Sequence, residues 1–483
     1  MIPTLRHFID GQAVAASSGL TLDVVSPVTE AVIAAMAAGT REDVDRAVQA
    51  ARAQLDGGEW ARMSGAQRGQ LIGRLADLCE RDAAQLGQYD AQSIGRPPAE
   101  PALLDLPNGI ATLRHAAGWA DRIEGRSIPT PGYMGMPTLS YTRREPVGVV
   151  AAIVPWNTPF MITCWKIGPA LAAGCTVVLK PAEETPQSAL HLAALCKEAG
   201  IPDGVLNVVT GAGEVVGRAL CEHPGVDKIT FTGSPEVGRE IQRIAGPLFK
   251  RVSLELGGKS PQIVFEDAQL DAAVKGCAMG LFFNQGQVCA AGSRILVHRS
   301  LAETFAGALA EVAASITVGD PAGEDVQMGA VAKREQFERI NAYITDGIRE
   351  GAQLLAGGVA THTRGWFARP TIFAKAHNHM RIAQEEIFGP VGTVIAFDSE
   401  DEAIALANDS RYGLAATVWT TDLARAHRVA HAVKAGAIGV NCWAPIDARL
   451  PWGGMKTSGI GRECGLSGVL AYTEEKTVTV LLA

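Results

Sequence analysis

From residue 147 onward, short apolar runs rich in β-branched residues alternate with segments of helical periodicity. Nearly continuous apolar runs are typical of parallel strands that are buried on both faces. The first series of predicted strands comprises residues 147–154, 176–179, 205–209 and 228–231, with a helix at 188–199. The second series comprises strands at 262–265, 294–297, 391–397, 416–419 and 437–440, with helices at 301–315 and 399–408. The pattern predicts two α/β units.

Three further segments have clear periodicity outside these two series. Residues 40–56 have the apolar spacing of a surface helix, with Thr40 as the N-cap and Asp43 three residues later. Residues 137–144 and 476–482 alternate like strands and are far apart in sequence. A strand near the chain end must pair within its own chain or across a subunit interface. We favour the interface.

Composition narrows the function. The 483 residues fit about three structural units. Lys and Arg number 43 against 51 Asp and Glu, a net charge of −8, so a nucleic-acid partner is not expected. No apolar run reaches the roughly 20 residues that a membrane span needs, and the start lacks a signal peptide. We therefore expect a cytoplasmic protein with a small-molecule substrate.

Nine cysteines occur without a CxxC pair, so we predict reduced thiols and no metal site. Eight lie in apolar or helical stretches and are interpreted as packing residues. Cys289 instead follows the polar run Asn-Gln-Gly-Gln and is a candidate nucleophile, which requires polar donors that favour the thiolate. We expect Gly286 and Gly292 to let substrate and cofactor approach it closely. Cys289 could equally be a packing residue.

Two polar residues in apolar surroundings are candidates for catalysis. Glu255 lies between two leucines, where apolar walls would raise the pKa of its carboxyl and suit a general base. It could instead be a strand residue that faces solvent. Asn157 lies between Pro155 and Pro159, and its amide could donate to an oxyanion or cap the next helix.

Two strand ends could bind a nucleotide. In FTGSPEVG (231–238), Gly233 permits a turn, and Ser234 and Pro235 suit a helix start that could bind phosphate. An ordinary strand-to-helix junction is the alternative, since the GxGxxG fingerprint is absent. Lys180 and Glu183 follow another strand, where a carboxylate could accept ribose hydroxyls and repel a 2′-phosphate. This would favour NAD over NADP, although a solvated loop is also possible.

Seven segments together resemble the NAD(P)-dependent aldehyde dehydrogenase superfamily, from about residue 6 to the C-terminus. They are PWNTP at 155, KPAEETP at 180, FTGSPEVG at 231, LELGGKSP at 254, FFNQGQVCAAGSR at 282, EEIFGPV at 385 and PWGGMKTSGIGRE at 451. The resemblance implies an α/β fold with a Rossmann-like cofactor domain, an α/β catalytic domain and a small oligomerisation ribbon. These would comprise residues 1–122 with 146–257, residues 258–457, and residues 123–145 with 471–483, with 458–470 as a return segment.

The resemblance also implies a mechanism. Cys289 would attack the aldehyde, Asn157 and the Cys289 N–H would hold the oxyanion, and hydride would pass to the nicotinamide. Glu255 would then activate water to hydrolyse the thioester, which distinguishes this type from relatives that acylate coenzyme A. Lys166 and Glu463 match family positions and would serve in positioning and proton relay.

The same resemblance assigns binding residues. Those implied for the cofactor are Ile153, Trp156, Lys180, Glu183, Gly213, Gly217, Phe231, Gly233, Ser234, Val237, Leu256, Glu386 and Phe388. Those implied for the substrate are Thr158, Met161, Ile162, Trp165, Phe283, Val288, Trp443, Pro445, Ile446 and Trp452. Most of the substrate set are apolar, which favours an aromatic, terpenoid or medium-chain aldehyde, and Thr158 should widen the entrance because many relatives carry a bulky aromatic there.

Alternatives remain. Arg449 could recognise the carboxylate of a semialdehyde. The protein could also be a cysteine esterase, or a non-catalytic member of the fold. The terminal strand indicates a homo-oligomer, a dimer or a tetramer.

Overall fold

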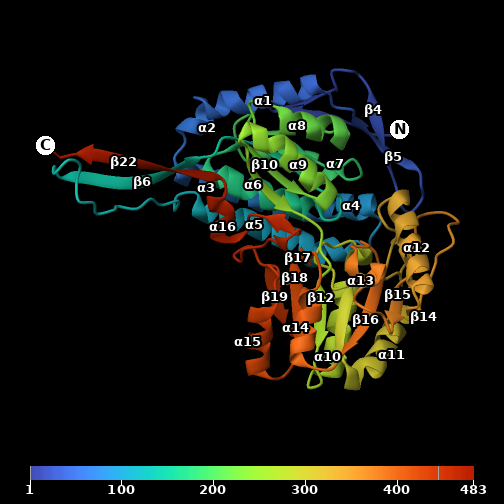
Figure 1. Ribbon diagram of the computed structural model, residues 1–483. Coiled ribbons are helices and arrows are strands. Elements are labelled where there is room, and N and C mark those ends of the chain that lie inside the picture. Colours follow the sequence, from blue (N-terminus) through green and yellow to red (C-terminus); the bar gives the residue numbers. More distant parts are fainter. Residues whose placement is uncertain (1, 444, 483) are drawn as a thin grey trace.

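The structure is a computed structural model that describes residues 2–443 and 445–482. It has two α/β units, one above the other in Figure 1, and a long two-stranded arm that projects from the upper unit. The ends of the predicted domain ranges at residues 1 and 483 lie outside the described residues. The fold class predicted from the sequence is confirmed, whereas the proposed domain boundaries stay a prediction.

An eight-stranded sheet forms the centre of the first unit, in the order β21-β11-β10-β7-β8-β9-β2-β3. Its middle strands run parallel, as the apolar runs predict. The strands are β2 His7–Ile9, β3 Gln12–Val14, β7 Val149–Ile153, β8 Thr176–Lys180, β9 Leu206–Val208, β10 Lys228–Thr232, β11 Arg251–Glu255 and β21 Gly459–Ile460. The short β21 belongs to the predicted return segment and pairs with β11.

Helices cover both faces of this sheet, which explains why its central strands β7 and β8 are buried at every residue. In β7, Val149 and Ala151 pack on the side of α1, α8 and α9, whereas Val150 and Ala152 pack toward α3, α5, α6 and α7. The helices are α1 Arg41–Leu55, α2 Glu59–Arg62, α3 Gly65–Arg81, α4 Ala83–Ile94, α5 Leu106–Trp119, α6 Pro159–Ala173, α7 Pro186–Glu198, α8 Arg218–Glu222 and α9 Pro235–Ala245. Thr40 caps α1 through the predicted exchange with Asp43.

A seven-stranded sheet forms the second unit, in the order β14-β15-β16-β13-β12-β18-β19, with only β14 antiparallel. The strands are β12 Pro261–Val264, β13 Arg294–His298, β14 Gln353–Ala356, β15 Thr371–Ala374, β16 Val391–Phe397, β18 Ala415–Trp419 and β19 Ala437–Val440. Helices α10 Leu270–Phe282 and α11 Arg299–Ser315 cover one face, and α12 Arg334–Arg349, α13 Arg381–Gln384, α14 Glu400–Asn408 and α15 Leu423–Ala432 the other. The strands predicted for this unit are confirmed.

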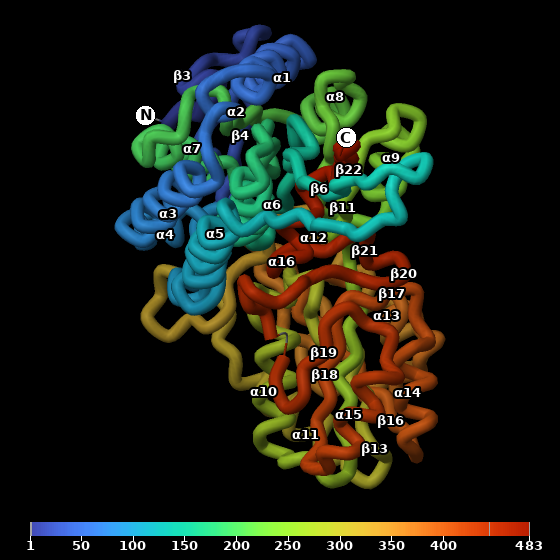
Figure 2. Tube along the Cα trace, turned by 90° about the vertical axis from the view of Figure 1, so that its left-hand side faces the viewer, coloured from blue at the N-terminus to red at the C-terminus, as the bar shows by residue number. Residues whose placement is uncertain are grey.

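The arm consists of β6 Thr138–Pro146 and β22 Thr473–Leu481, which pair antiparallel over their full length. In Figure 2 the molecule is turned so that the arm points toward the reader. The terminal strand therefore pairs within its own chain, the alternative that we did not favour, and pairing of the arm across a subunit interface stays a prediction. The physical reason is that α16 Gly465–Leu470 returns the chain to the first unit, where Val147 N–H donates to the Tyr472 carbonyl and starts the pairing.

Smaller elements complete the fold. They are a three-stranded sheet of β1 Thr4–Leu5, β5 Val32–Ala37 and β4 Thr21–Val25, a pair of β17 Tyr412–Gly413 with β20 Met455–Lys456, and the single turns η1 Pro101–Asp105, η2 Gly213–Gly217, η3 Gly246–Leu248 and η4 Phe283–Gly286. None of the helices formed by residues 2–443 and 445–482 has both the length and the apolar composition that crossing a bilayer requires.

Candidate active site

Three of the predicted catalytic residues line one cavity of about 450 Å³. Glu255 is the last residue of β11, Asn157 lies between β7 and α6, and Cys289 lies in the loop between η4 and β13. The carboxyl ends of strands β7 and β11 of the first unit therefore contribute Asn157 and Glu255, and the loop before β13 of the second unit contributes Cys289. In doubly wound folds, ligands bind at this edge of the sheet.

The Glu255 carboxyl is buried, with 4% of the residue exposed, so it does not face solvent. Burial, followed by the charge of Glu463, raises its pKa well above the usual value, while Lys166 acts in the opposite direction. Leu254 and Leu256 are buried as well, but they belong to the apolar cluster on the side of α1, α8 and α9, so the two leucines are not the cause of the raised pKa. A carboxyl with a raised pKa can take up a proton near neutral pH, as a general base must.

Lys166 and Glu463 form a buried ion pair, with 2.5 Å between Nζ and Oε1. The Thr230 hydroxyl lies 3.2 Å from each of these two atoms. Neither Lys166 nor Glu463 lines the cavity. The charges of Glu463 and Lys166 act in opposite directions on the pKa of Glu255, and the roles of the two residues in positioning and proton relay stay predictions.

The loop before Cys289 has an unusual backbone. Asn284, Gln285 and Gly286 have successive positive φ angles of 51°, 55° and 71°. A Cβ on Gly286 would lie 2.3 Å from the Gly389 carbonyl oxygen, and one on Gly292 would lie 2.4 Å from the Gln262 side chain. Our expectation that these two glycines admit substrate and cofactor was therefore wrong, because both are in contact with the protein itself.

The environment of Cys289 does not favour the thiolate. Burial, followed by the charges of Glu386 and Glu255, raises the pKa of its thiol to about 12, although the backbone N–H groups of Ala290 and Cys289 act in the opposite direction. The polar donors expected from the sequence are present, but burial and the two carboxyls outweigh them. Attack therefore requires that a base remove the thiol proton.

The remaining cysteines also correct one prediction. Seven of them are buried, as expected for packing residues, but Cys442 is exposed. It lies in a bend after β19, where the neighbouring Asn441 is exposed as well. Cys442 is thus not a packing residue.

Asn157 connects the two units. Its side-chain Nδ2 donates to the Gln287 carbonyl over 3.0 Å, and its own carbonyl accepts from the Asn284 side-chain amide over 2.9 Å. The N-cap of α6 is Thr158, so Asn157 does not cap this helix. The Nδ2 group carries a second N–H, which suits donation to an oxyanion in the cavity.

The nucleotide-binding candidates fall into two groups. Trp156, Gly233, Ser234, Leu256, Glu386 and Phe388 line the same cavity. Ser234 caps α9 as predicted, since its hydroxyl accepts from the Val237 N–H. Glu386 accepts from the Gly258 N–H over 3.0 Å, and burial raises its pKa to about 7. Trp156 and Phe388 pack edge to face, with ring centroids 5.3 Å apart.

The second group lies outside the cavity lining and comprises Ile153, Lys180, Glu183, Gly213, Gly217, Phe231 and Val237. The Glu183 carboxylate contacts Lys180 Nζ over 2.9 Å and accepts from the Gly213 N–H over 2.6 Å. Glu183 therefore already has two partners, and its 39% exposure leaves it accessible to a further donor. A partly exposed carboxylate beside a glycine turn, together with the helix start at Ser234, fits a dinucleotide.

The predicted substrate residues largely come together. Nine of the ten line the cavity with Cys289: Thr158, Met161, Ile162, Trp165, Phe283, Val288, Trp443, Ile446 and Trp452. Pro445 does not, because its side chain is exposed to solvent. Phe283 and Trp443 pack together, with ring centroids 6.1 Å apart. The cavity is therefore apolar on the side of Cys289 that faces α6.

Sequence reasoning missed part of the lining. It did not find Leu104 of η1, nor Lys333, Gln336, Arg339, Tyr343, Arg381, Glu385, Arg411 and Tyr412. Four of these belong to α12 or the residue that precedes it, a helix whose polar face reaches the cavity. The helix at residues 334–349 was not among those predicted, and nothing in its amphipathic pattern indicates which polar residues face a ligand.

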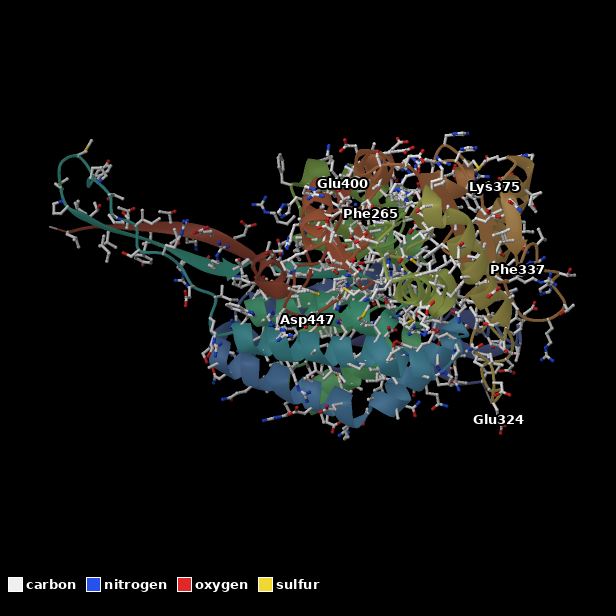
Figure 3. All side chains as sticks on the ribbon, turned by 90° about the horizontal axis from the view of Figure 1, so that it is seen from below. Phe265, Glu324, Phe337, Lys375, Glu400 and Asp447 are labelled. Atoms are coloured by element: carbon white, nitrogen blue, oxygen red, sulfur yellow. The ribbon has the colours of Figure 1, made fainter. Side chains whose placement is uncertain are left out.

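Arg449 does not lie in this cavity. Its guanidinium forms a two-point ion pair with Asp447, over 2.8 and 2.7 Å, and is 76% exposed. Both residues line a separate hollow of about 930 Å³ beside α4 and α5. Figure 3 labels Asp447 next to these helices, away from the second sheet. Recognition of a substrate carboxylate by Arg449 therefore has no support from its position.

The molecule is thus of the class of α/β proteins with a ligand cavity at the carboxyl ends of their strands, here with a cysteine and a buried carboxyl in it. The profile of the Aldehyde dehydrogenase family matches residues 14–478. The human mitochondrial aldehyde dehydrogenase is 47% identical over 475 residues, covering 98% of this chain and 91% of its own. Retinal dehydrogenase 2 of Gallus gallus is 46% identical, covering 98% and 91%.

Solved structures agree with these relatives. The NAD+ complex of an aldehyde dehydrogenase from Bacillus cereus superposes with a TM-score of 0.97 at 44% identity, covering 99% of this chain and 97% of its own. The chain belongs to the aldehyde dehydrogenase family. The family, the fold class and the type of enzyme predicted from the sequence are therefore confirmed.

Proposed function

We propose that this enzyme oxidises an aldehyde to its carboxylic acid with NAD, through a covalent intermediate on Cys289. The observation that carries the proposal is that a thiol, a side-chain amide and a buried carboxyl with a raised pKa line one cavity. The thiol suits the role of nucleophile, the amide that of oxyanion donor and the carboxyl that of general base.

The chain's own residues support the following sequence. Once a base has taken the Cys289 proton, the sulfur attacks the aldehyde carbon, and Asn157 Nδ2 with the Cys289 N–H stabilises the oxyanion. A bound nicotinamide supplies the acceptor for the hydride. The resulting thioester is attacked by a water whose proton goes to Glu255, and the acid leaves as the thiol re-forms. The buried Glu255 carboxyl has the raised pKa that this proton transfer needs.

The cofactor proposal rests on Glu183 and the start of α9. Glu183 stands at the end of β8, where a second negative charge from a 2′-phosphate would be repelled. Gly233 and Ser234 present a helix N-terminus to the cavity, which suits a pyrophosphate. The NAD+ complex of the Bacillus cereus relative supports NAD as the cofactor. We therefore propose that NAD is preferred over NADP.

The proposed substrate is a hydrophobic aldehyde. The nine predicted substrate residues that line the cavity are apolar or aromatic except Thr158, and Leu104 adds another apolar side chain. The relative retinal dehydrogenase 2, which is 46% identical to this chain, is named for an apolar aldehyde, and this supports the proposal. A site of this composition discriminates mainly by apolar area and shape.

One experiment tests the function. The purified protein is incubated with aromatic, terpenoid, aliphatic and carboxylate-bearing aldehydes, each with NAD or NADP, and reduced nicotinamide is followed by absorbance. We expect the fastest reduction of NAD with the apolar aldehydes. Ester cleavage without reduction of either cofactor would instead indicate a hydrolase. The absence of both cofactor reduction and ester cleavage would indicate a non-catalytic protein.

We also propose a homo-oligomer. Large apolar side chains on the arm and in the segment that leads into β6 are exposed, among them Met134 at 82% and Tyr133 at 59%. Exposed apolar groups gathered on one projecting element are typical of a protein interface. The molar mass in solution would distinguish a dimer from a tetramer, and a monomer would contradict the proposal. The cytoplasmic location stays a prediction, which cell fractionation would test.

A further inference from the structure

A cluster of four ionisable side chains, three of them buried and Glu100 half-buried, lies beside the cavity, and the mechanism above does not use it. Asp90 belongs to α4, Arg96 follows this helix, and Glu100 and Asp105 belong to the turn around η1. Asp90, Arg96 and Asp105 are 1%, 0% and 0% exposed. Arg96 is ion-paired to Asp105. Burying ionisable groups costs stability unless each is well compensated.

The cluster contains three carboxyls and one guanidinium. Burial raises the pKa of Asp90 and of Glu100 to about 7 in each case, although the nearby Arg96 charge acts in the opposite direction. A cluster kept only for stability would be better served by apolar side chains of similar size. The two carboxyls that are not paired to Arg96 therefore call for another explanation, and their contacts provide one.

Asp90 holds the start of the helix that follows Asn157. Its Oδ2 accepts from the Phe160 N–H over 3.1 Å. This N–H belongs to the first turn of α6, where backbone donors have no partner within the helix. The N-cap residue Thr158 makes no side-chain cap of its own, so Asp90 caps α6 from another helix. Asp90 thereby fixes the backbone three residues after the Asn157 amide.

Glu100 reaches the other side of the site. Its Oε1 accepts from the Asn284 N–H over 3.4 Å, in the left-handed stretch that leads to Cys289. The Asn284 side chain in turn donates to the Asn157 carbonyl and to the Gln287 carbonyl. Glu100 therefore holds the backbone of the residue whose side chain fixes Asn157 against the Cys289 loop.

We infer that Asp90 and Glu100 are positioning residues: from one cluster of ionisable side chains they hold Asn157 and the Cys289 loop at the relative placement that oxyanion stabilisation requires. Arg96 and Asp105 anchor the cluster. The inference rests on the proposed function, since it assigns these residues to the step in which Asn157 donates to the oxyanion. A misplacement of about 1 Å at such a site can lower the rate by roughly 100-fold.

The test separates the loss of the hydrogen-bond acceptor from the loss of the negative charge. Asp90→Asn and Glu100→Gln keep an oxygen at the same reach, so we expect kcat to stay within about threefold of the parent. Asp90→Ala and Glu100→Ala remove the acceptor, and Glu100→Asp keeps the charge but withdraws the oxygen by one methylene. For these three we expect kcat to fall by roughly 10- to 100-fold, with the KM for aldehyde and for NAD within about threefold.

Asp43→Ala is the matched control. Asp43 is also a fully buried acid that holds a helix start, since it accepts from the Thr40 and Ser17 N–H groups far from the cavity. It should lower the melting temperature as Asp90→Ala does and leave kcat unchanged. Activity is counted per active site from the burst of reduced cofactor. If an alanine variant does not fold, Glu100→Asp decides alone.

The outcomes separate the two proposals. Reduction of NAD by the parent protein, with kcat values for Glu100→Asp and the alanine variants equal to that of Asp43→Ala, would overturn the positioning role and leave the proposed function intact. Equal losses in Glu100→Gln and Glu100→Ala would also overturn it, because the acceptor oxygen would then be irrelevant. A parent protein that oxidises none of the aldehydes would contradict the proposed function itself.

Discussion

Two walls of the same cavity are built in opposite ways. On one wall, Glu255 ends β11, and the parallel ladder with β10 sets its position through the pair Thr232 and Glu255. On the other wall, Cys289 follows a loop with three successive left-handed residues, and this loop is held by hydrogen bonds with Glu100, Asn157 and Ala332. We refer to β11 with Glu255 at its end as the strand wall, and to residues 282–292 as the loop wall.

The difference shows where sequence changes should act. On the strand wall the backbone is fixed by ladder hydrogen bonds, so replacing a side chain removes one chemical group and leaves its neighbours in place. On the loop wall the backbone depends on close approaches. A Cβ on Gly258 would lie 2.4 Å from the Cys289 carbonyl oxygen, and one on Gly286 would meet Gly389. Small changes there should displace the nucleophile.

The largest effect is expected at the nucleophile of the loop wall. Cys289→Ala should lower aldehyde oxidation by about 10⁴-fold or more and abolish the burst of reduced cofactor, because no covalent intermediate can form. The exposed thiol of Cys442 provides the control, and Cys442→Ser should keep the parent's activity. A burst in Cys289→Ala would place the nucleophile elsewhere.

The base of the strand wall should have a smaller effect. Glu255→Gln keeps the size and position of the side chain but removes the proton acceptor, so we expect steady-state turnover to fall by roughly 10²- to 10³-fold. The burst should persist at full amplitude, because hydride transfer precedes hydrolysis. Stopped-flow measurement of reduced cofactor separates the two phases. Unchanged steady-state turnover would remove Glu255 from the mechanism.

The loop wall should also be the more fragile in folding. Gly286→Ala places a Cβ at φ 71° against the Gly389 backbone, so we expect the free energy of unfolding to fall by about 3 kcal/mol. Gly73 lies within α3 with open space around it, and Gly73→Ala should raise the free energy of unfolding by roughly 0.5–1 kcal/mol. Urea titration measures both variants. Equal stabilities would show that the loop adapts to the extra methyl group.

The electrostatics of the two walls predict a pH dependence. Because the Cys289 thiol has a pKa of about 12, the thiolate fraction of the cofactor-free protein should rise about tenfold per pH unit between roughly pH 7 and 10. Alkylation of Cys289 by iodoacetamide, measured in a Cys442→Ser background by mass spectrometry, should follow that slope. An alkylation rate that levels off below about pH 9 would show that burial and the two carboxyls do not determine the pKa of this thiol.

The same contrast explains what the sequence revealed. Glu255 and Ser234 were predictable from their sequence neighbours. Glu255 is a carboxylate between two leucines, and Ser234 lies between a glycine that permits a turn and a proline that suits a helix start. The role of Gly286 was not, since its partner Gly389 is about a hundred residues away and no local pattern connects them. For the same reason Leu104 and the polar face of α12 were missed, whereas motif similarity alone brought Asn157 and Cys289 together.

The smallest effect is expected outside both walls. Arg449 is paired with Asp447 at an exposed site beside the second hollow, so Arg449→Ala should change kcat/KM by less than about twofold for apolar and carboxylate-bearing aldehydes alike. Trp443→Ala is the comparison, since loss of its packing against Phe283 of the loop wall should lower kcat/KM for the apolar aldehydes only. A tenfold loss confined to carboxylate-bearing aldehydes in Arg449→Ala would require the chain around Ile446 to move Arg449 into the cavity, and substrate choice would then be governed by charge instead of apolar area.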